Sequence, residues 1–194
     1  MNFVTKYIDQ FSKECLNISC ESINLIVQNL VKVRDKKGRL FIIGVGGSAG
    51  NASHAANDFR KLCNIETYAP TDNISELTAR TNDEGFDTIF SEYLKVSQLN
   101  SNDAILIFSV GGGNLEKNVS VNLIEAIKLA KKRKCKVFSL VGKSDGYAAL
   151  NSDVSVIIKV KDSSLITPMS ESFQSVIWHC IVSHPDLAVN ATKW

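Results

Sequence analysis

The sequence lacks the features that mark membrane, secreted and polyanion-binding proteins. The sequence contains no run of about 18 apolar residues, the length that a membrane-spanning helix needs. Charged residues begin at Lys6, which argues against a signal peptide. No charge of one sign dominates, since 22 Lys and Arg are balanced by 20 Asp and Glu to a net charge of +2. We therefore expect a cytoplasmic protein whose partners include neither nucleic acid nor membrane.

Cysteine motifs are also absent. The five cysteines are an odd number without C-x-x-C spacing, so neither a disulfide framework nor a metal site built on paired cysteines is expected. Most lie among apolar neighbours, which predicts reduced and packed thiols. Cys180 directly follows His179, but adjacent helical residues point about 100° apart and cannot easily share a target.

What the sequence does contain is the pattern of one α/β domain. Its 194 residues, 44% hydrophobic and 22% charged, suit a single globular unit. Short continuous apolar runs flanked by turn residues start at Leu40, Ala104, Lys136 and Val154, and a shorter run over 65–68 predicts an edge strand. Continuous apolarity is typical of strands buried on both faces of a parallel sheet. We therefore predict a doubly wound sheet of about five strands.

Segments with helical spacing precede and separate these runs. Residues 3 to about 33 predict two helices or one bent helix, with a break near 17–22. Further helices are expected over 48–62, 87–98, 115–134 and, after Pro168, from about Met169 to Val182. The order predicts one domain, with an N-terminal helical segment over 1–35 and an α/β core over 36–194. The basic run 131–136 is better explained as the end of a helix, complementing its dipole, than as a nucleic-acid patch.

Two glycine-rich turns follow predicted strands, GVGGSAGNASH from Gly44 to His54 and SVGGGN from Ser109 to Asn114. In such folds ligands bind beyond the carboxyl ends of the strands, where backbone N–H groups and a helix dipole favour an anion. Ala49 replaces the third glycine of G-x-G-x-x-G, and no P-loop lysine follows, so no nucleotide cofactor is expected. Glycine also serves tight packing, but two turns in register favour a phosphorylated small molecule.

Two pairs of histidine and acidic residues fall on predicted helices. His54 and Asp58 are four residues apart, Glu171 and His179 are eight apart, and each pair shares a helix face. An isolated pair of this kind is more often an ordinary surface hydrogen bond. If the two helices converge, however, the four side chains could form either a tetrahedral zinc site or a general acid and base pair.

A further polar cluster, TARTNDEGF, contains Asn82 and Asp83 shortly before Gly85, which is typical of a turn and helix entry.

The sequence resembles the sugar isomerase (SIS) domain family, and within it the phosphoheptose isomerases. The resemblance lies in the order and spacing of four segments: GVGGSAGNASHAANDF, TNDEGF, SVGGGN and the segment from Glu171 to His179. The resemblance covers nearly the whole chain. It implies a single SIS domain over 1–194 with a five-stranded parallel sheet, and a homotetramer with active sites at its subunit interfaces.

The resemblance also implies roles for individual residues. Asp58 takes the place of the family's catalytic glutamate and His179 that of its partner histidine, so these two are expected to be catalytic. Zinc, which some members hold, would bind His54, Asp58, Glu171 and His179. The expected substrate contacts are Gly46, Gly47, Ser48, Asn82, Asp83, Ser109, Val110, Gly111, Gly112, Asn114 and Glu171.

The chain departs from the family pattern at three places. Asp58 is one methylene shorter than glutamate, which moves a base by more than about 1 Å. Glu171 replaces a glutamine and adds an anionic ligand for a metal. The phosphate loop, usually Ser-Thr-Ser-Gly-Asn-Ser, has lost most of its hydroxyls, so Ser109, Asn114 and backbone N–H groups would have to bind the phosphate.

The activity that the resemblance implies is conversion of sedoheptulose 7-phosphate to D-glycero-D-manno-heptose 7-phosphate through an enediolate, for lipopolysaccharide or capsule sugars. The alternative is a non-catalytic SIS protein, either a tetramer that associates with a replication initiator or a regulator that binds a sugar phosphate. Retention of His54, Asp58 and His179 favours the enzyme, whereas the thinned phosphate loop favours the alternative.

Overall fold

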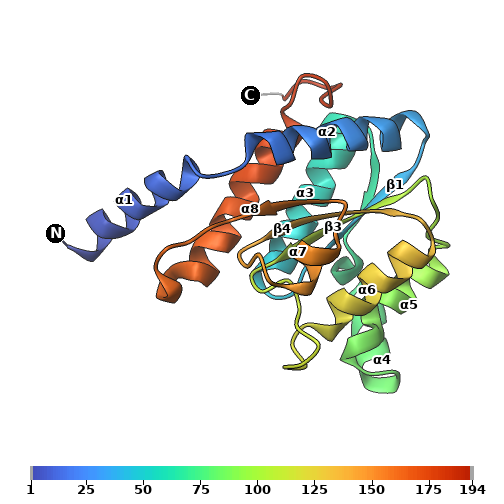
Figure 1. The fold of residues 1–194 in the computed structure, drawn as a ribbon. Helices are drawn as coiled ribbons and strands as arrows, with labels where there is room; N and C mark the ends of the chain where they lie inside the picture. Colours follow the sequence, from blue (N-terminus) through green and yellow to red (C-terminus); the bar gives the residue numbers. More distant parts are fainter. Residues whose placement is uncertain (1, 193–194) are drawn as a thin grey trace.

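Five parallel strands form the centre of the molecule in the computed structural model, which describes residues 2–192 (Figure 1). They are β1 (Arg39–Ile43), β2 (Glu66–Tyr68), β3 (Ala104–Ser109), β4 (Lys136–Val141) and β5 (Val154–Ile157). Their order is β2-β1-β3-β4-β5, with Phe41 opposite Ile105 and Ile105 opposite Val137. The predicted parallel sheet of about five strands is confirmed.

Helices cover both faces of this sheet. They are α1 (Phe3–Cys15), α2 (Cys20–Asp35), α3 (Gly47–Cys63), α4 (Ile74–Asp83), α5 (Ile89–Val96), α6 (Val121–Lys132), α7 (Tyr147–Asn151) and α8 (Ile166–Val182), with short 3-10 turns η1 (Pro70–Asp72), η2 (Phe86–Thr88) and η3 (Ser163–Leu165). All six residues of β3 are buried. Leu106 and Phe108 belong to the core beneath α2, α3 and α8, while Ile105 and Ile107 belong to the core beneath α5, α6 and α7. Burial on both faces explains why the strands are continuously apolar.

The N-terminal segment forms two separate helices and not one bent helix, which were the two predicted alternatives. The side chain of Ser19 accepts a hydrogen bond from the N–H of Ser22 and so starts α2 after the break. Figure 1 shows α1 projecting away from the sheet, attached near α8, where Phe11 stacks on Phe173 at 4.1 Å between ring centroids. Phe3 and Ile8 on α1 remain exposed.

Three predicted helices have different bounds in the structure. The helix expected over 115–134 begins only at Val121, because Asn114 pairs with Val119 across a loop in which Asn118 takes a positive φ. The segment 87–98 divides into η2 and α5. The last helix starts at Ile166, which places Pro168 within its first turn, where no N–H donor is needed.

Two helices, α4 and α7, were not predicted at all. α4 has no buried residue, so its sequence carries no apolar stripe that would reveal it. The side chain of Asn73 caps its start, and Arg80 forms ion pairs with Glu76 and Glu84 along its surface. Asn82 and Asp83 therefore end a helix, which corrects the interpretation of this segment as a helix entry.

The cysteines are free thiols in two different settings. Cys63 and Cys135 are buried, but Cys15, Cys20 and Cys180 are exposed, so the prediction of packed thiols is wrong for these three.

Within residues 2–192, no helix combines the length and the apolar character that crossing a membrane requires.

Candidate functional site

Helices α3 and α8 lie side by side and run in the same direction from the carboxyl end of the sheet. Gly47 lies against the Glu171 carboxylate near their first turns, and the Cys63 thiol contacts the Val182 carbonyl oxygen at 3.6 Å near their last turns. α3 follows β1 through Gly46, whose φ of 64° is readily available only to glycine. The strands β1 and β3 are neighbours, but the chain passes from β1 to β2 on one side and from β3 to β4 on the other. The carboxyl end of the sheet between β1 and β3 is therefore a topological switch point.

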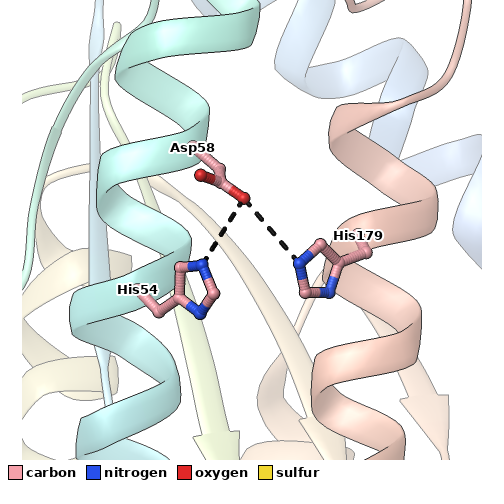
Figure 2. A group of neighbouring side chains, drawn as sticks. All are labelled: His54, Asp58 and His179. Carbon is pink, nitrogen blue, oxygen red and sulfur yellow. Dashed lines mark ion pairs between the residues drawn. The ribbon is translucent and has the colours of Figure 1, made fainter. Parts of the chain in front are cut away.

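His54, Asp58 and His179 meet between these two helices (Figure 2). One ligand atom from each lies within 4.8 Å of the other two. The Asp58 Oδ2 atom lies 3.9 Å from His54 Nε2 and 3.8 Å from His179 Nε2. Both distances are longer than a hydrogen bond. The carboxylate oxygen therefore faces the two ring nitrogens across a gap that a small atom can fill.

Neighbouring groups orient each member of this cluster. His179 Nδ1 lies 2.8 Å from the Ser175 carbonyl oxygen, which can only accept, so Nδ1 carries the proton and the neutral ring keeps its lone pair at Nε2. The second carboxylate oxygen of Asp58 accepts a 2.8 Å hydrogen bond from the Asn57 side-chain amide. The buried Trp178 ring stacks on His179 at 3.5 Å and meets His54 edge-on at 4.7 Å.

The cluster lines a pocket of about 320 Å³ between α3, α8 and the C-terminal segment, and none of residues 109–114 lines it. Two imidazole nitrogens and one carboxylate oxygen are the donor set of many catalytic zinc sites, which leave a position open for water or substrate. The fixed tautomer of His179 is the kind of outer-shell support that such ligands have. The donor set therefore fits a zinc ion. A larger hollow of about 730 Å³ between α3, β2 and α4 is lined by no histidine.

Glu171, the fourth expected ligand, is not part of this cluster. It precedes His179 by eight residues, which is about 12 Å along a helix. Its carboxylate lies instead against Gly47, so close that a Cβ atom on Gly47 would stand 2.5 Å from Glu171 Oε2. Within one chain the structure thus brings together three of the four predicted metal ligands.

The first glycine-rich turn leads straight into α3, as expected, and Gly46 and Gly47 are exposed. Ser48 is only 2% exposed, and its hydroxyl group lies 3.1 Å from the Gln174 side-chain oxygen.

The second turn keeps its backbone donors but uses its side chains internally. Ser109 Oγ accepts from the Gly112 N–H, and the Asn114 side chain accepts from the Lys117 N–H. The N–H groups of Val110, Gly111 and Gly113 have no hydrogen-bond partner in the described part of the chain. Because α6 starts only at Val121, the expected helix dipole does not stand directly behind this turn.

Asn82 and Asp83 lie at the exposed end of α4, where the Asn82 amide donates to the Asp83 carboxylate at 2.7 Å. Neither residue lines the pocket of the histidine cluster. The structure of one chain therefore does not bring the predicted sugar contacts together with the predicted catalytic pair.

Sequence reasoning assigned no role to four residues that orient or support the predicted ones: Asn57, Ser175, Trp178 and Gln174. Ser175 precedes His179 by four residues, so the helical spacing that paired His54 with Asp58 could have found it. Trp178 and Gln174 gave no comparable signal, because their contacts with α3 depend on how the two helices pack.

The fold is a doubly wound α/β domain, and its candidate site is a polar cluster between two parallel helices. The SIS domain family model matches residues 4–142, and the chain belongs to this family.

Its relatives place it among the phosphosugar isomerases of the family. Phosphoheptose isomerase from Helicobacter pylori strain P12 is 28% identical over 181 residues, covering 89% of this chain and 91% of that protein. The structure of phosphoheptose isomerase GmhA from Neisseria gonorrhoeae has a TM-score of 0.78 at 25% identity, covering 92% of this chain and 94% of that one.

A third relative is longer than this chain. Lincomycin biosynthesis protein LmbN from Streptomyces lincolnensis is 34% identical over 154 residues, or 76% of this chain, but the match spans only 56% of that protein.

Proposed function

We propose that the chain is an aldose–ketose isomerase that converts sedoheptulose 7-phosphate to D-glycero-D-manno-heptose 7-phosphate. The observation that carries the proposal is the meeting of Asp58 with His54 and His179 in one pocket. The phosphoheptose isomerases among the relatives supply the substrate class. The resemblance to the family implies that the product serves lipopolysaccharide or capsule sugars, and the composition predicts a location in the cytoplasm.

The chemistry moves a proton between C1 and C2 of the sugar through an enediolate. Asp58 is the base that takes this proton, because its Oδ2 atom faces the open gap of the pocket. His179 exchanges protons with the sugar oxygens through Nε2, whose lone pair is kept available by the Nδ1–H bond to Ser175. Proton transfer of this kind accelerates reactions by about 10²–10⁴-fold.

A zinc ion held by His54, Asp58 and His179 would polarise the sugar carbonyl. In that case Asp58 can act as a base only through the oxygen that does not bind the metal. Acid–base catalysis by Asp58 and His179 and metal-assisted catalysis therefore make different predictions for a chelator, which removes activity only in the second case.

The site is completed by another copy of the chain. Phosphate binding is assigned to the unpaired N–H groups of Val110, Gly111 and Gly113, which do not line the pocket of the histidine cluster. A homotetramer with active sites between subunits, as the sequence resemblance implies, would join the two parts.

Incubation of the purified protein with sedoheptulose 7-phosphate, with and without zinc, followed by NMR of the aldose product, tests the proposal. Asp58→Asn, which keeps size and removes the base, should lower kcat by at least about 100-fold. Asp186→Asn is the matched control, because Asp186 is an exposed aspartate near His184 and away from the pocket. Absence of turnover in both conditions, together with binding of the sugar phosphate, would favour the non-catalytic alternative.

A further inference from the structure

The His54 ring is held by weaker contacts than the other two members of the histidine cluster. The Asn57 amide donates to Asp58, and the Ser175 carbonyl oxygen accepts from His179. The His54 side chain makes no hydrogen bond to any described residue, and its Nε2 atom lies 3.9 Å from Asp58. A histidine that binds a metal almost always has such a hydrogen bond on its other ring nitrogen. Packing must therefore orient His54.

His54 is also the most exposed member of the cluster. Its side chain is 61% exposed, against 48% for His179 and 15% for Asp58. Exposed side chains change rotamer on the picosecond to nanosecond timescale. The contacts on the buried side of the His54 ring therefore decide how long the ring stays beside Asp58.

The indole ring of Trp178 supplies those contacts. It meets the His54 ring edge-on, with 4.7 Å between the ring centroids and 66° between the planes. This edge-to-face arrangement is one that aromatic rings favour. The same indole stacks on His179 at 3.5 Å. Trp178 thus connects the imidazole on α3 with the imidazole on α8, which face each other in Figure 2.

Packing of the core alone does not explain a tryptophan at this position. Trp178 is 0% exposed, and it is the largest fully buried side chain in the described part of the chain. Its indole Nε1 atom has no hydrogen-bond partner there. Burial of an unpaired donor costs free energy, which an apolar side chain of similar shape would avoid. A buried group of this kind indicates a role beyond the packing of the core.

The two histidines depend on the indole to different degrees. His179 has a second restraint, because its Nδ1 atom lies 2.8 Å from the Ser175 carbonyl oxygen one turn earlier on α8. Without the indole, His54 would keep only the more distant ring of His179, at 5.5 Å between centroids. Loss of the indole should therefore affect the cluster mainly through His54.

We infer that Trp178 is a positioning residue that holds His54 in the orientation in which the cluster binds zinc. Its ring takes the place of the hydrogen bond that His54 lacks. This inference rests on the proposed function, because it takes the cluster as a zinc site, and it adds the group that orients the most exposed ligand.

Replacement of Trp178 tests the inference through zinc affinity, measured by competition with a fluorescent chelator. Trp178→Leu removes the aromatic ring and should raise the Kd for zinc about tenfold, as loss of outer-shell support does. Trp178→Phe keeps an aromatic ring and should stay within about threefold of the parent. Phe173→Leu is the matched control, because Phe173 is equally buried on α8 but stacks on Phe11. It should leave the Kd unchanged.

A second background separates positioning of His54 from a general loss of packing. In a His54→Ala variant, Trp178→Leu should change the Kd for zinc by less than about twofold, because the ring that the indole orients is gone. A further loss of about tenfold in this background would overturn the inference. So would an equal loss of affinity in Phe173→Leu and Trp178→Leu.

Nuclear magnetic resonance of the metal-free protein observes the His54 ring directly. The chain has three histidines, so comparison with His54→Ala assigns the His54 signals, and Trp194→Phe removes the signals of the second tryptophan. Nuclear Overhauser effects should connect the ring protons of His54 and Trp178. In Trp178→Leu, the chemical shifts of His54 should move towards those of a free imidazole, because the indole ring current is lost.

This measurement also keeps the two proposals distinguishable. If the parent binds no zinc, metal-assisted catalysis fails as part of the proposed function, while a shift of the His54 signals in Trp178→Leu still supports positioning by the indole. If the His54 signals are the same in the parent and Trp178→Leu, the inference is wrong whatever the zinc affinity and the turnover.

Discussion

Asn57 shows how a residue outside the predicted set can control the site. Its amide donates to Asp58 Oδ1 at 2.8 Å and so leaves Oδ2 to face the two imidazoles. Loss of such outer-shell hydrogen bonds typically costs about 10–100-fold in metal affinity or activity. We expect Asn57→Ala to weaken zinc binding by this factor, measured by competition with a fluorescent chelator.

Ser53→Ala is the matched control for Asn57→Ala, because Ser53 is exposed one turn earlier on α3 and does not line the pocket. Equal zinc affinities for the parent and both variants would show that Asn57 does not orient Asp58.

The five thiols should divide into two groups by reactivity. Burial raises the pKa of Cys63 and of Cys135 to about 12, whereas Cys15, Cys20 and Cys180 are exposed. Only thiolates react readily with alkylating reagents, so brief treatment of the native protein at pH 8 should modify three cysteines. Mass spectrometry should find five modified after unfolding. Modification of Cys63 or Cys135 in the native protein would contradict the described packing.

The same two thiols make stability depend on alkaline pH. Their pKa in the folded chain is about 12, above the ordinary value of 9.0, so the unfolded chain loses these protons first. The free energy of unfolding should therefore fall as pH rises from about 9 towards 12, by up to about 1.4 kcal/mol per pH unit for each thiol. Urea titrations at pH 8 and pH 10.5 measure the change. A Cys63→Ala variant should show a shallower decline than the parent.

Individual elements were predictable where one physical signal dominated. β3 could be identified because strands buried on both faces must be continuously apolar, as residues 104–109 are. α4 could not, because it buries no residue and is held by a cap and surface ion pairs. The loop 114–120 was mistaken for helix because its apolar residues have helical spacing, while the tertiary pairing of Asn114 with Val119 prevents one.

The candidate site shows the same division. Helical spacing, which a sequence displays, pairs His54 with Asp58 and Glu171 with His179, and the resemblance to the family then implied roles for these residues. The direction of the Ser48 hydroxyl depends on Gln174, 126 residues away, through the packing of α3 against α8. Contacts between distant elements leave no periodic trace in a single sequence, so the contact between Gln174 and Ser48 could only be found in the structure.

The second glycine-rich turn depends on a specific backbone conformation. Gly113 has a φ of 87°, and a Cβ atom there would stand 2.9 Å from Ile124 Cγ1. Gly113→Ala should therefore lower the free energy of unfolding by about 1–3 kcal/mol in a urea titration. Gly111→Ala is the matched control, because a methyl group there would point into open space, with no other part of the fold within 4 Å, and its φ is ordinary. Equal stabilities of the two variants would show that the turn is not constrained in this way.

The chain carries an exposed apolar helix, and its histidine cluster and its second glycine-rich turn do not line a common pocket. The proposed tetramer would account for both features. Phe3, Val4 and Ile8 on α1 are 69%, 66% and 61% exposed, on a helix that projects from the sheet (Figure 1). Apolar side chains grouped in this way favour contact with another protein surface. The pocket of the histidine cluster contains no residue of the 109–114 turn, and the proposed partner copy would bring the proposed phosphate-binding and catalytic groups together.

Phe3→Asp combined with Ile8→Asp should therefore break the proposed tetramer and the activity together. Light scattering after size exclusion measures the mass, and the NMR assay measures turnover on the same fractions. Leu150→Asp is the control, because Leu150 is 70% exposed but lies on α7, far along the chain from α1. We expect the control to remain tetrameric and active, and the double variant to lose kcat in proportion to its dissociated fraction. A dissociated variant with full activity would show that one chain alone contains the complete site.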